Sequence, residues 1–144
     1  IIKGIESYVP KNNRSEMVST DIGNIVIKDY YNANPSSMKA AIANAKQVSK
    51  EKNLIFILAD MFELGEYASE EHQDIAHYAE SLSPNAVYLI GNDFMNTHTS
   101  FAQKFSTTEN AIAHLKKEHI RDSVILIKGS NGMNLSELYN DLDF

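Results

Sequence analysis

The chain of 144 residues has no cysteine, few glycines and prolines, and no long hydrophobic run. The absence of Cys excludes a disulfide framework, a thiolate nucleophile and a Cys-based zinc site, and it leaves the redox compartment open. Six Gly and three Pro are too few for a collagenous or low-complexity chain. The longest apolar run, residues 54–59, is far shorter than the roughly 20 residues of a membrane-spanning helix. We therefore expect one compact domain with no membrane insertion. A reducing cytoplasm is the preferred compartment.

Positive charge is also scarce, with 13 Lys and Arg against 19 Asp and Glu and a net charge of −6. Binding to a nucleic-acid backbone needs clustered cations, because much of the affinity comes from releasing the counterions of the phosphates. Nucleic acid is therefore not an expected partner. The chain begins with Ile1 rather than Met, so we expect a piece of a longer polypeptide or a processed chain.

Three short apolar runs, at residues 54–59, 86–90 and 124–127, are continuous rather than alternating. This pattern is typical of parallel strands that are covered by helices on both faces. Residues 17–20 and 25–29 flank a turn that contains Gly23, which predicts an antiparallel hairpin at a sheet edge.

Helical patterns alternate with these strands. The clearest begins with Asn34 as N-cap and Pro35 as first residue, and it runs past Val48. Together with the strands, the helices predict an α/β fold with an open, mostly parallel sheet, an antiparallel edge hairpin and helices on both faces. The other three helices are expected at residues 69–82 with Ser69 as the cap, at 109–117, and from about Asn134.

Ligands on such sheets bind at the carboxyl ends of the strands, and the segments at residues 28–34, 60–63, 91–93 and 128–132 are all polar. A carboxylate such as Asp29 can accept both hydroxyls of a ribose, and the amides of Asn32 and Asn34 can pair with the edge of a base. The alternative is that these residues only form a turn and a helix cap.

The segment 128–132, Lys-Gly-Ser-Asn-Gly, is similar to a cradle for a phosphate or carboxylate, with Lys128 as the cation. It is neither GxxxxGK[ST] nor GxGxxG. Asp60 is a candidate ligand for a cation or an amine, although capping of a loop is the commoner role. His72 is either a contact at the start of a helix or a group that faces substrate. The five His include no HExxH, so we expect surface histidines and no metal site.

Longer segments carry a family resemblance. Residues 29–41 read DYYNANPSSMKAA, residues 58–66 read LADMFELGE, and residues 127–133 read IKGSNGM. Tyr8-Val9-Pro10 followed by Arg14 precedes them. In order and spacing, these segments resemble the carboxyl-terminal domain of the bacterial muramoyl-peptide ligases, the Mur ligases. The form of the first two segments is that of the members that join D-alanyl-D-alanine to UDP-N-acetylmuramoyl-tripeptide.

The resemblance implies a Rossmann-like carboxyl-terminal domain over residues 11–144, with residues 1–10 as the end of a central ATPase domain and a linker. Its expected partners are the central and N-terminal domains of the same ligase. It also implies the reaction, in which ATP phosphorylates the tripeptide carboxylate and the dipeptide amine attacks the acyl phosphate. The family keeps its phosphate-binding loop and Mg²⁺ ligands in the central domain, and this sequence lacks them. We therefore expect the chain to be inactive alone. The whole ligase is expected to be a monomeric enzyme of peptidoglycan synthesis.

The family's functional residues can be carried over by position. Arg14 matches the Arg that reaches the ATP phosphates and is the expected catalytic residue, because a guanidinium holds two phosphate oxygens in fixed geometry. Asp29 matches the Asp that faces the ribose, and Tyr31, Asn32 and Asn34 fall in the nucleotide-facing loop. On the dipeptide side of the cleft we expect Asp60, His72, Lys128 and Ser130.

Three positions depart from the family pattern: Lys28 replaces an acidic residue, Tyr30 replaces Ser, and Ala59 stands where Gly is common. None of them carries an expected role. Two alternatives stay open, a sister ligase with another amino-acid substrate and a nucleotide-binding α/β module without chemistry. A phosphate-binding loop in the upstream sequence would favour a ligase over the module.

Overall fold

The computed structural model describes residues 15–144, which form one six-stranded sheet in the order β1-β2-β6-β3-β4-β5. The pair β1–β2 is antiparallel and the other pairs are parallel, which confirms the predicted open sheet with an edge hairpin. The elements in chain order are β1 (Glu16–Ser19), β2 (Ile25–Asp29), α1 (Pro35–Ser49), β3 (Asn53–Ala59), the 3₁₀ turn η1 (Gly65–Tyr67), α2 (Ala68–Ser81), β4 (Ala86–Ile90), α3 (Asn92–Met95), β5 (Gln103–Phe105), α4 (Thr108–Leu115), β6 (Ser123–Lys128) and α5 (Leu135–Asp141).

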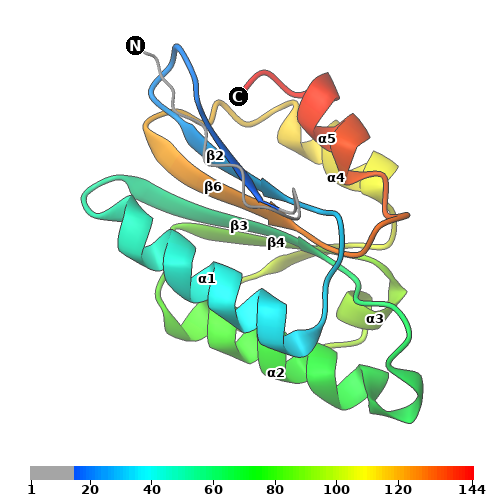
Figure 1. The fold of residues 1–144 in the computed structure, drawn as a ribbon. Helices are drawn as coiled ribbons and strands as arrows, with labels where there is room; N and C mark the ends of the chain where they lie inside the picture. The colour runs from blue at the N-terminus through cyan, green and yellow to red at the C-terminus, as the bar shows by residue number, and fades with distance from the viewer. Residues whose placement is uncertain (1–14) are drawn as a thin grey trace.

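Helices cover both faces of the sheet, with α1 and α2 side by side on one face and α4 and α5 on the other (Figure 1). Side chains alternate between the faces along each strand. Phe56 and Leu58 of β3 therefore join one core cluster with α1, α2 and α3, whereas Ile55 and Ile57 join another with α4 and α5. This double burial is why the strand runs are continuously apolar.

The chain leaves the central strand β6 toward the opposite face from its two neighbours in the sheet. After β2 and β3 it enters α1 and α2 on one face, but after β6, which lies between them, it passes to α5 on the other face (Figure 1). Such a switch point separates the loops at the carboxyl edge and is where ligands of open α/β sheets bind. The register places Asp29 beside Lys128, and Lys128 beside Leu58, at this edge.

The predicted start of α1 is confirmed in detail. Asn34 is the N-cap, its side chain accepts a hydrogen bond from the Ser37 N–H at 2.8 Å, and the Ser37 hydroxyl accepts from the Asn34 N–H at 3.0 Å. This capping box satisfies two of the free backbone donors at the helix start, with Pro35 as first residue.

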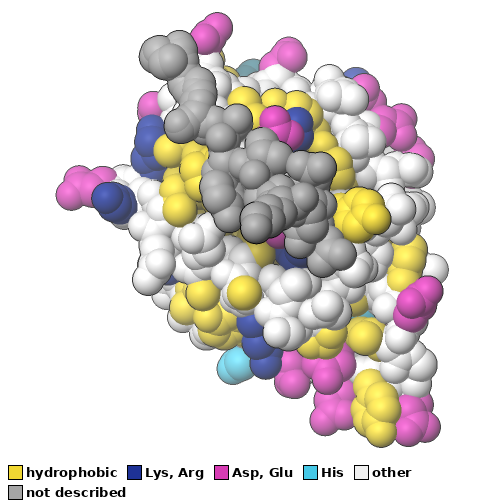
Figure 2. Space-filling view, in the orientation of Figure 1, with side chains coloured by type: hydrophobic (Ala, Val, Ile, Leu, Met, Phe, Trp, Pro, Cys, Tyr) yellow, Lys and Arg dark blue, Asp and Glu magenta, His cyan; other side chains and the backbone are white. Residues whose placement is uncertain are grey.

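The predicted cap of α2 is wrong, because α2 begins at Ala68, directly after η1, and Ser69 lies inside its first turn. No side chain caps this end. Instead Glu70 and Glu71 lie in the first turn, where carboxylates interact favourably with the helix dipole. Figure 2 shows acidic side chains gathered at the lower right, over this part of the molecule. Among the described residues, no helix is both long enough and apolar enough to span a bilayer.

Two short elements, α3 and β5, are not predicted from the sequence. They have four and three residues, too few to show a helical or alternating pattern. Residues 91–93, expected as a polar loop, are therefore the start of a helix. This changes the role of Asp60, as described below.

Candidate functional site

Lys128 ties together the ends of β2 and β6. Its side chain is buried, with the residue only 2% exposed, and Nζ lies 3.0 Å from Asp29 Oδ1. The ammonium also donates a hydrogen bond to the carbonyl of Asn32 at 3.0 Å. Lys128, expected as the cation of a phosphate or carboxylate cradle, is thus paired with groups inside the domain. It fixes the Asp29 carboxylate and the loop that follows.

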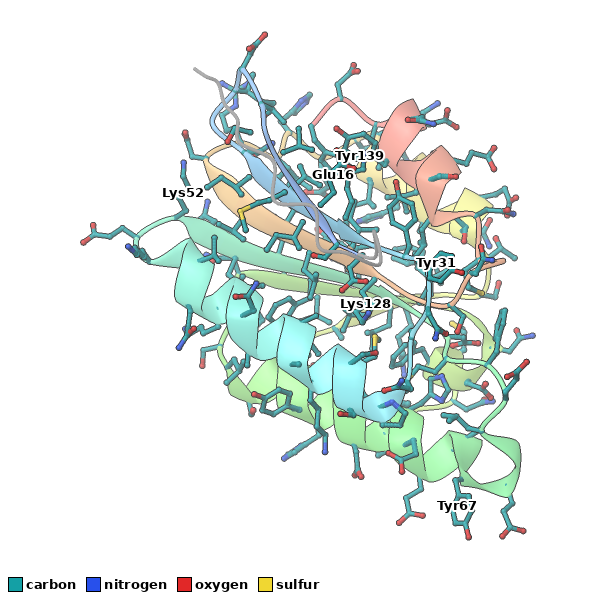
Figure 3. All side chains as sticks on the ribbon, viewed as in Figure 1. Glu16, Tyr31, Lys52, Tyr67, Lys128 and Tyr139 are labelled. Carbon is teal, nitrogen blue, oxygen red and sulfur yellow. The ribbon has the colours of Figure 1, made fainter. Side chains whose placement is uncertain are left out.

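The loop after β2 presents polar side chains to the surface. Tyr31 is 57% exposed, and Asn32 and Asn34 are exposed as well. Tyr31 lies at the same edge as Lys128 (Figure 3). The turn-and-cap alternative is also realised here, because Asn32 Oδ1 accepts from the Ala33 N–H at 2.9 Å and Asn34 caps α1. A capping role and an exposed position are thus combined in one loop.

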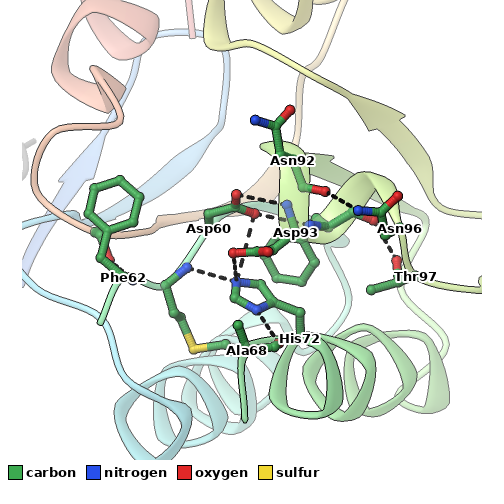
Figure 4. A network of polar contacts seen from close by, with 11 residues as sticks. Asp60, Phe62, Ala68, His72, Asn92, Asp93, Asn96 and Thr97 are labelled. Carbon is green, nitrogen blue, oxygen red and sulfur yellow. Dashed lines mark hydrogen bonds and ion pairs between the residues drawn. The ribbon is translucent and has the colours of Figure 1, made fainter. Parts of the chain in front are cut away.

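Asp60 caps α3 from the end of the neighbouring strand. Its carboxylate accepts hydrogen bonds from the backbone N–H groups of Asp93 and Phe94, each at 3.0 Å (Figure 4). Burial raises the pKa of Asp60 above its usual range, while these two N–H donors act to lower it. At Gly91, whose φ is +121°, a Cβ atom would overlap the Asp60 carboxyl group. The capping alternative is therefore the one the structure supports.

His72 is fully buried, so the expectation of surface histidines is wrong at this position. Its Nδ1–H donates to the Ala68 carbonyl at 2.7 Å, and Nε2 accepts from the Met61 N–H at 2.9 Å (Figure 4). Both roles are dictated by the partners, because a carbonyl only accepts and an amide N–H only donates. The ring also makes an edge contact with Phe94, with centroids 4.7 Å apart.

The hydrogen bonds of Asp60 and His72 also decide whether a metal ion could bind between them. Within residues 15–144, Asp60, His72 and Asp93 are the one trio of potential ligands whose atoms lie close together. However, the Met61 N–H occupies the Nε2 lone pair of His72 and two backbone donors occupy the Asp60 carboxylate. The trio does not fit Mg²⁺, which prefers oxygen ligands and retained waters.

Ser130 joins the loop after β6 to the loop after β3. Its Oγ accepts from the Phe62 N–H at 2.9 Å, and its own N–H donates to the Asp60 carbonyl at 3.1 Å. Gly129 allows this approach, since a Cβ there would collide with Ala59. Sequence reasoning missed Phe62, which is 45% exposed at this edge. Its only signal in the sequence is an aromatic residue in a loop at the carboxyl end of a strand.

The predicted site residues thus fall into three groups. Asp29, Tyr31, Asn32 and Asn34 lie at the end of β2 and in the loop that leads to α1. Arg14, like the predicted boundary at residue 10, lies outside the described residues. Asp60, His72 and Ser130 lie together near the end of β3, whereas Lys128 pairs with Asp29 of the first group, and all four are buried. A separate cleft of about 570 Å³ lies at the opposite edge of the sheet, between Ile22 and Leu142.

Comparison with known proteins agrees with this fold. The family described as "Mur ligase, glutamate ligase domain" matches residues 13–131. The UDP-N-acetylmuramoyl-tripeptide–D-alanyl-D-alanine ligase of Rickettsia prowazekii is 35% identical over 118 residues, which are 78% of this chain and 26% of that protein. The chain spans between about a quarter and a third of the length of the curated relatives compared with it.

Solved structures show the same architecture. A crystal structure of MurF from Acinetobacter baumannii superposes with a TM-score of 0.76 at 24% identity, covering 94% of this chain and 30% of that one. MurF ligase from Thermotoga maritima, solved in complex with ADP, gives a TM-score of 0.72 at 17% identity, covering 95% of this chain and 31% of that one. Since the family match spans most of the sequence, the chain belongs to the Mur ligase family and has the fold of its C-terminal domain.

Proposed function

We propose that the chain is the nucleotide- and substrate-closing domain of an ATP-dependent ligase that joins D-alanyl-D-alanine to UDP-N-acetylmuramoyl-tripeptide. The observation that carries the proposal is the similarity, over nearly the whole chain, to relatives that bear this ligase name. The wider protein would act in the cytoplasm, as a monomer, in peptidoglycan synthesis. The sister-ligase alternative has no comparable support among these relatives.

The proposed reaction has two steps. ATP transfers its terminal phosphoryl group to the tripeptide carboxylate, which gives an acyl phosphate and ADP. The amine of D-alanyl-D-alanine then attacks the acyl carbon and loses a proton, and phosphate leaves as the amide forms. Mg²⁺ would neutralise the phosphate charge in the first step. Its ligands would come from the central domain of the whole ligase, since the trio near Asp60 does not fit it.

The nucleotide side of the proposal uses the loop after β2. Asp29 would accept the ribose hydroxyls, held in place by Lys128 at 3.0 Å. The exposed side chains of Tyr31, Asn32 and Asn34 would face the nucleotide. Arg14 would reach the phosphates. Because only one wall of the ATP site belongs to this domain, the isolated chain should bind ATP weakly.

The dipeptide side uses the loops after β3 and β6. The burial of Asp60, His72 and Lys128 favours an indirect role for them, in which they shape the wall that the dipeptide contacts. Ser130 lies between the two loops and holds them together. The wall itself would be formed by the backbone of these loops and by the exposed Phe62.

The test is an assay of the full-length protein that contains this chain. We expect phosphate release that requires ATP, the UDP-linked tripeptide and D-alanyl-D-alanine together. Replacing the dipeptide with a single amino acid should abolish release. Release with a single amino acid, on this or another UDP-linked acceptor, would identify a sister ligase. Nucleotide binding without release under any combination would identify a binding module.

Two variants of the same protein test the nucleotide side. Arg14→Ala should lower kcat about 100-fold or more, as expected when a charge-stabilising donor is lost. Asp29→Asn should chiefly raise the KM for ATP, by about tenfold, through weaker hydrogen bonds to the ribose. Asp21→Asn, exposed in the turn at the opposite edge, is the matched control and should leave both constants unchanged. Unaltered kinetics in Arg14→Ala would remove that residue from the site.

A further inference from the structure

Three consecutive backbone N–H groups at the end of β3 are each held by a different element. The Asp60 N–H donates to the Ile90 carbonyl of β4 at 3.0 Å, and the Met61 N–H donates to His72 Nε2 of α2 at 2.9 Å. The Phe62 N–H donates to Ser130 Oγ, beyond β6, at 2.9 Å. A loop without regular secondary structure is thereby fixed from three sides.

His72 is the fully buried side chain of this set. Burying the two polar nitrogens of an imidazole carries a free-energy penalty unless both are hydrogen-bonded. The imidazole is stable there because both nitrogens are hydrogen-bonded, one to Ala68 on its own helix and the other to the loop. His72 therefore connects the first turn of α2 to the backbone that follows β3.

The hydrogen bond between His72 and Met61 lies directly beneath an exposed part of the loop after β3. Met61 is buried, but the next residue, Phe62, is exposed, and its ring lies beside Gly132 of the loop after β6. The Ser130 N–H donates to the Asp60 carbonyl, so the two loops are joined in both directions. They form one wall at the switch point of the sheet.

We propose that His72 is a positioning residue that holds this wall in the geometry needed to bind the amine substrate. The inference rests on the proposed ligase function and adds a residue that acts through Met61 and Phe62 without touching substrate. A wall that is already ordered loses little conformational entropy when a small peptide binds. Loosening it should therefore weaken dipeptide binding and leave ATP binding unchanged.

A pair of substitutions separates the two hydrogen bonds of His72. The amide of Asn reaches the place of Nδ1, so His72→Asn keeps a donor for the Ala68 carbonyl and loses the acceptor for Met61. The amide of Gln reaches the place of Nε2, so His72→Gln keeps the acceptor for Met61. Ser130→Ala removes the acceptor for Phe62 and provides a third variant if His72→Asn does not fold. His77→Asn, exposed on the same helix, is the control.

In the full-length ligase, we expect His72→Asn and Ser130→Ala to raise the KM for D-alanyl-D-alanine about tenfold, the effect of losing one hydrogen bond to a buried donor. His72→Gln should stay within about twofold of the wild type, and the KM for ATP should not change in any variant. An unchanged dipeptide KM in His72→Asn and Ser130→Ala, or a larger rise in His72→Gln than in His72→Asn, would overturn the proposal.

Hydrogen exchange in the 144-residue chain separates a failure of this inference from a failure of the proposed function. The Met61 amide should exchange about tenfold faster in His72→Asn than in the wild type, and it should remain protected in His72→Gln. If the wild-type ligase releases no phosphate, the proposed function is wrong, but the Met61 amide still reports whether His72 holds the loop. Equal exchange in all three proteins would show that it does not.

Discussion

Two loops at the same edge of the sheet use their polar groups in opposite ways. The loop after β2 turns Tyr31 and Asn32 toward the surface, whereas the loop after β3 directs its backbone N–H groups inward, to His72 and Ser130. The difference shows that a site of this kind has an exposed part that can meet a ligand and a buried part that keeps the neighbouring wall in place.

The largest expected effect is on the buried part. Gly91→Ala should lower the free energy of unfolding by roughly 3–5 kcal/mol, because the new Cβ overlaps the Asp60 carboxyl group and the φ of +121° is strained. Gly65→Ala is the matched control, with a φ of +58° and no atom within 4 Å of its Cβ, and should lose only about 1 kcal/mol. Urea denaturation of the chain measures both. Equal losses would mean that the Asp60 cap contributes little.

Lys128→Met should have the next largest effect. It removes the cation 3.0 Å from Asp29 at a buried position and should destabilise the chain by roughly 2–4 kcal/mol. Lys28→Met is the comparison on the same strand pair, because Lys28 lies 3.5 Å from the more exposed Glu16 and 4.1 Å from the Tyr139 ring centroid. It should lose about 1 kcal/mol or less. Denaturation curves that shift equally would contradict the distinction between the two pairs.

A third loop, at residues 98–102, is likewise fixed through its backbone N–H groups by a side chain of α2. The Glu80 carboxylate accepts from the N–H groups of Ser100, Phe101 and Ala102 at 2.7–3.0 Å. Burial alone would raise the pKa of Glu80, but these three donors outweigh it and the pKa is lowered. Glu80→Gln should cost about 1 kcal/mol at pH 7.

The pH dependence of this effect has a definite sign. A carboxyl group with a lowered pKa in the folded state stabilises fully above its unfolded pKa of about 4.3, and the stabilisation is lost as the pH falls through the folded value. The stability difference between wild type and Glu80→Gln should therefore be constant from pH 7 to 5 and shrink below about pH 4. Asp74→Asn, exposed on the same helix, is the control. A difference that persists at pH 2 would contradict the assignment.

The smallest effect on stability is expected in the exposed part. Tyr31→Ala should change the free energy of unfolding by less than about 0.5 kcal/mol, because the side chain is 57% exposed. In the full-length ligase it should raise the KM for ATP about fivefold, the loss of one aromatic contact. Tyr67→Ala, equally exposed in η1, should change neither quantity. A large loss of stability in Tyr31→Ala would place Tyr31 in the buried part instead.

Local signals in the sequence predicted the elements that depend on local interactions. Asn34 and Pro35 identify the start of α1, and continuous apolar runs identify β3, β4 and β6 within one or two residues. By contrast, α3 is capped by Asp60, which lies 33 residues before Asp93 in the sequence. No pattern within residues 91–95 reveals that interaction, so the helix could not be predicted.

For the candidate site, too, the sequence predicted positions along the chain but not interactions between distant residues. Alternating strands and helices place the ends of β2, β3 and β6 at one edge, and the polar residues there are correctly located. Which of them face outward could not be predicted, because the burial of His72 and Lys128 depends on partners from other elements, Met61 and Asp29. In the sequence, a Lys or His that will be buried with a partner cannot be distinguished from one that will lie on the surface.

The order of the sheet has a consequence for how the protein is made. The strand β6 lies between β2 and β3, is buried along its whole length, and comes after five of the six strands in the chain. During synthesis, the strand edges of β2 and β3 that pair with β6 therefore stay unpaired until residue 128 has left the ribosome. Unpaired strand edges invite association between chains. A product truncated before Ser123 should aggregate instead of forming a smaller version of this sheet.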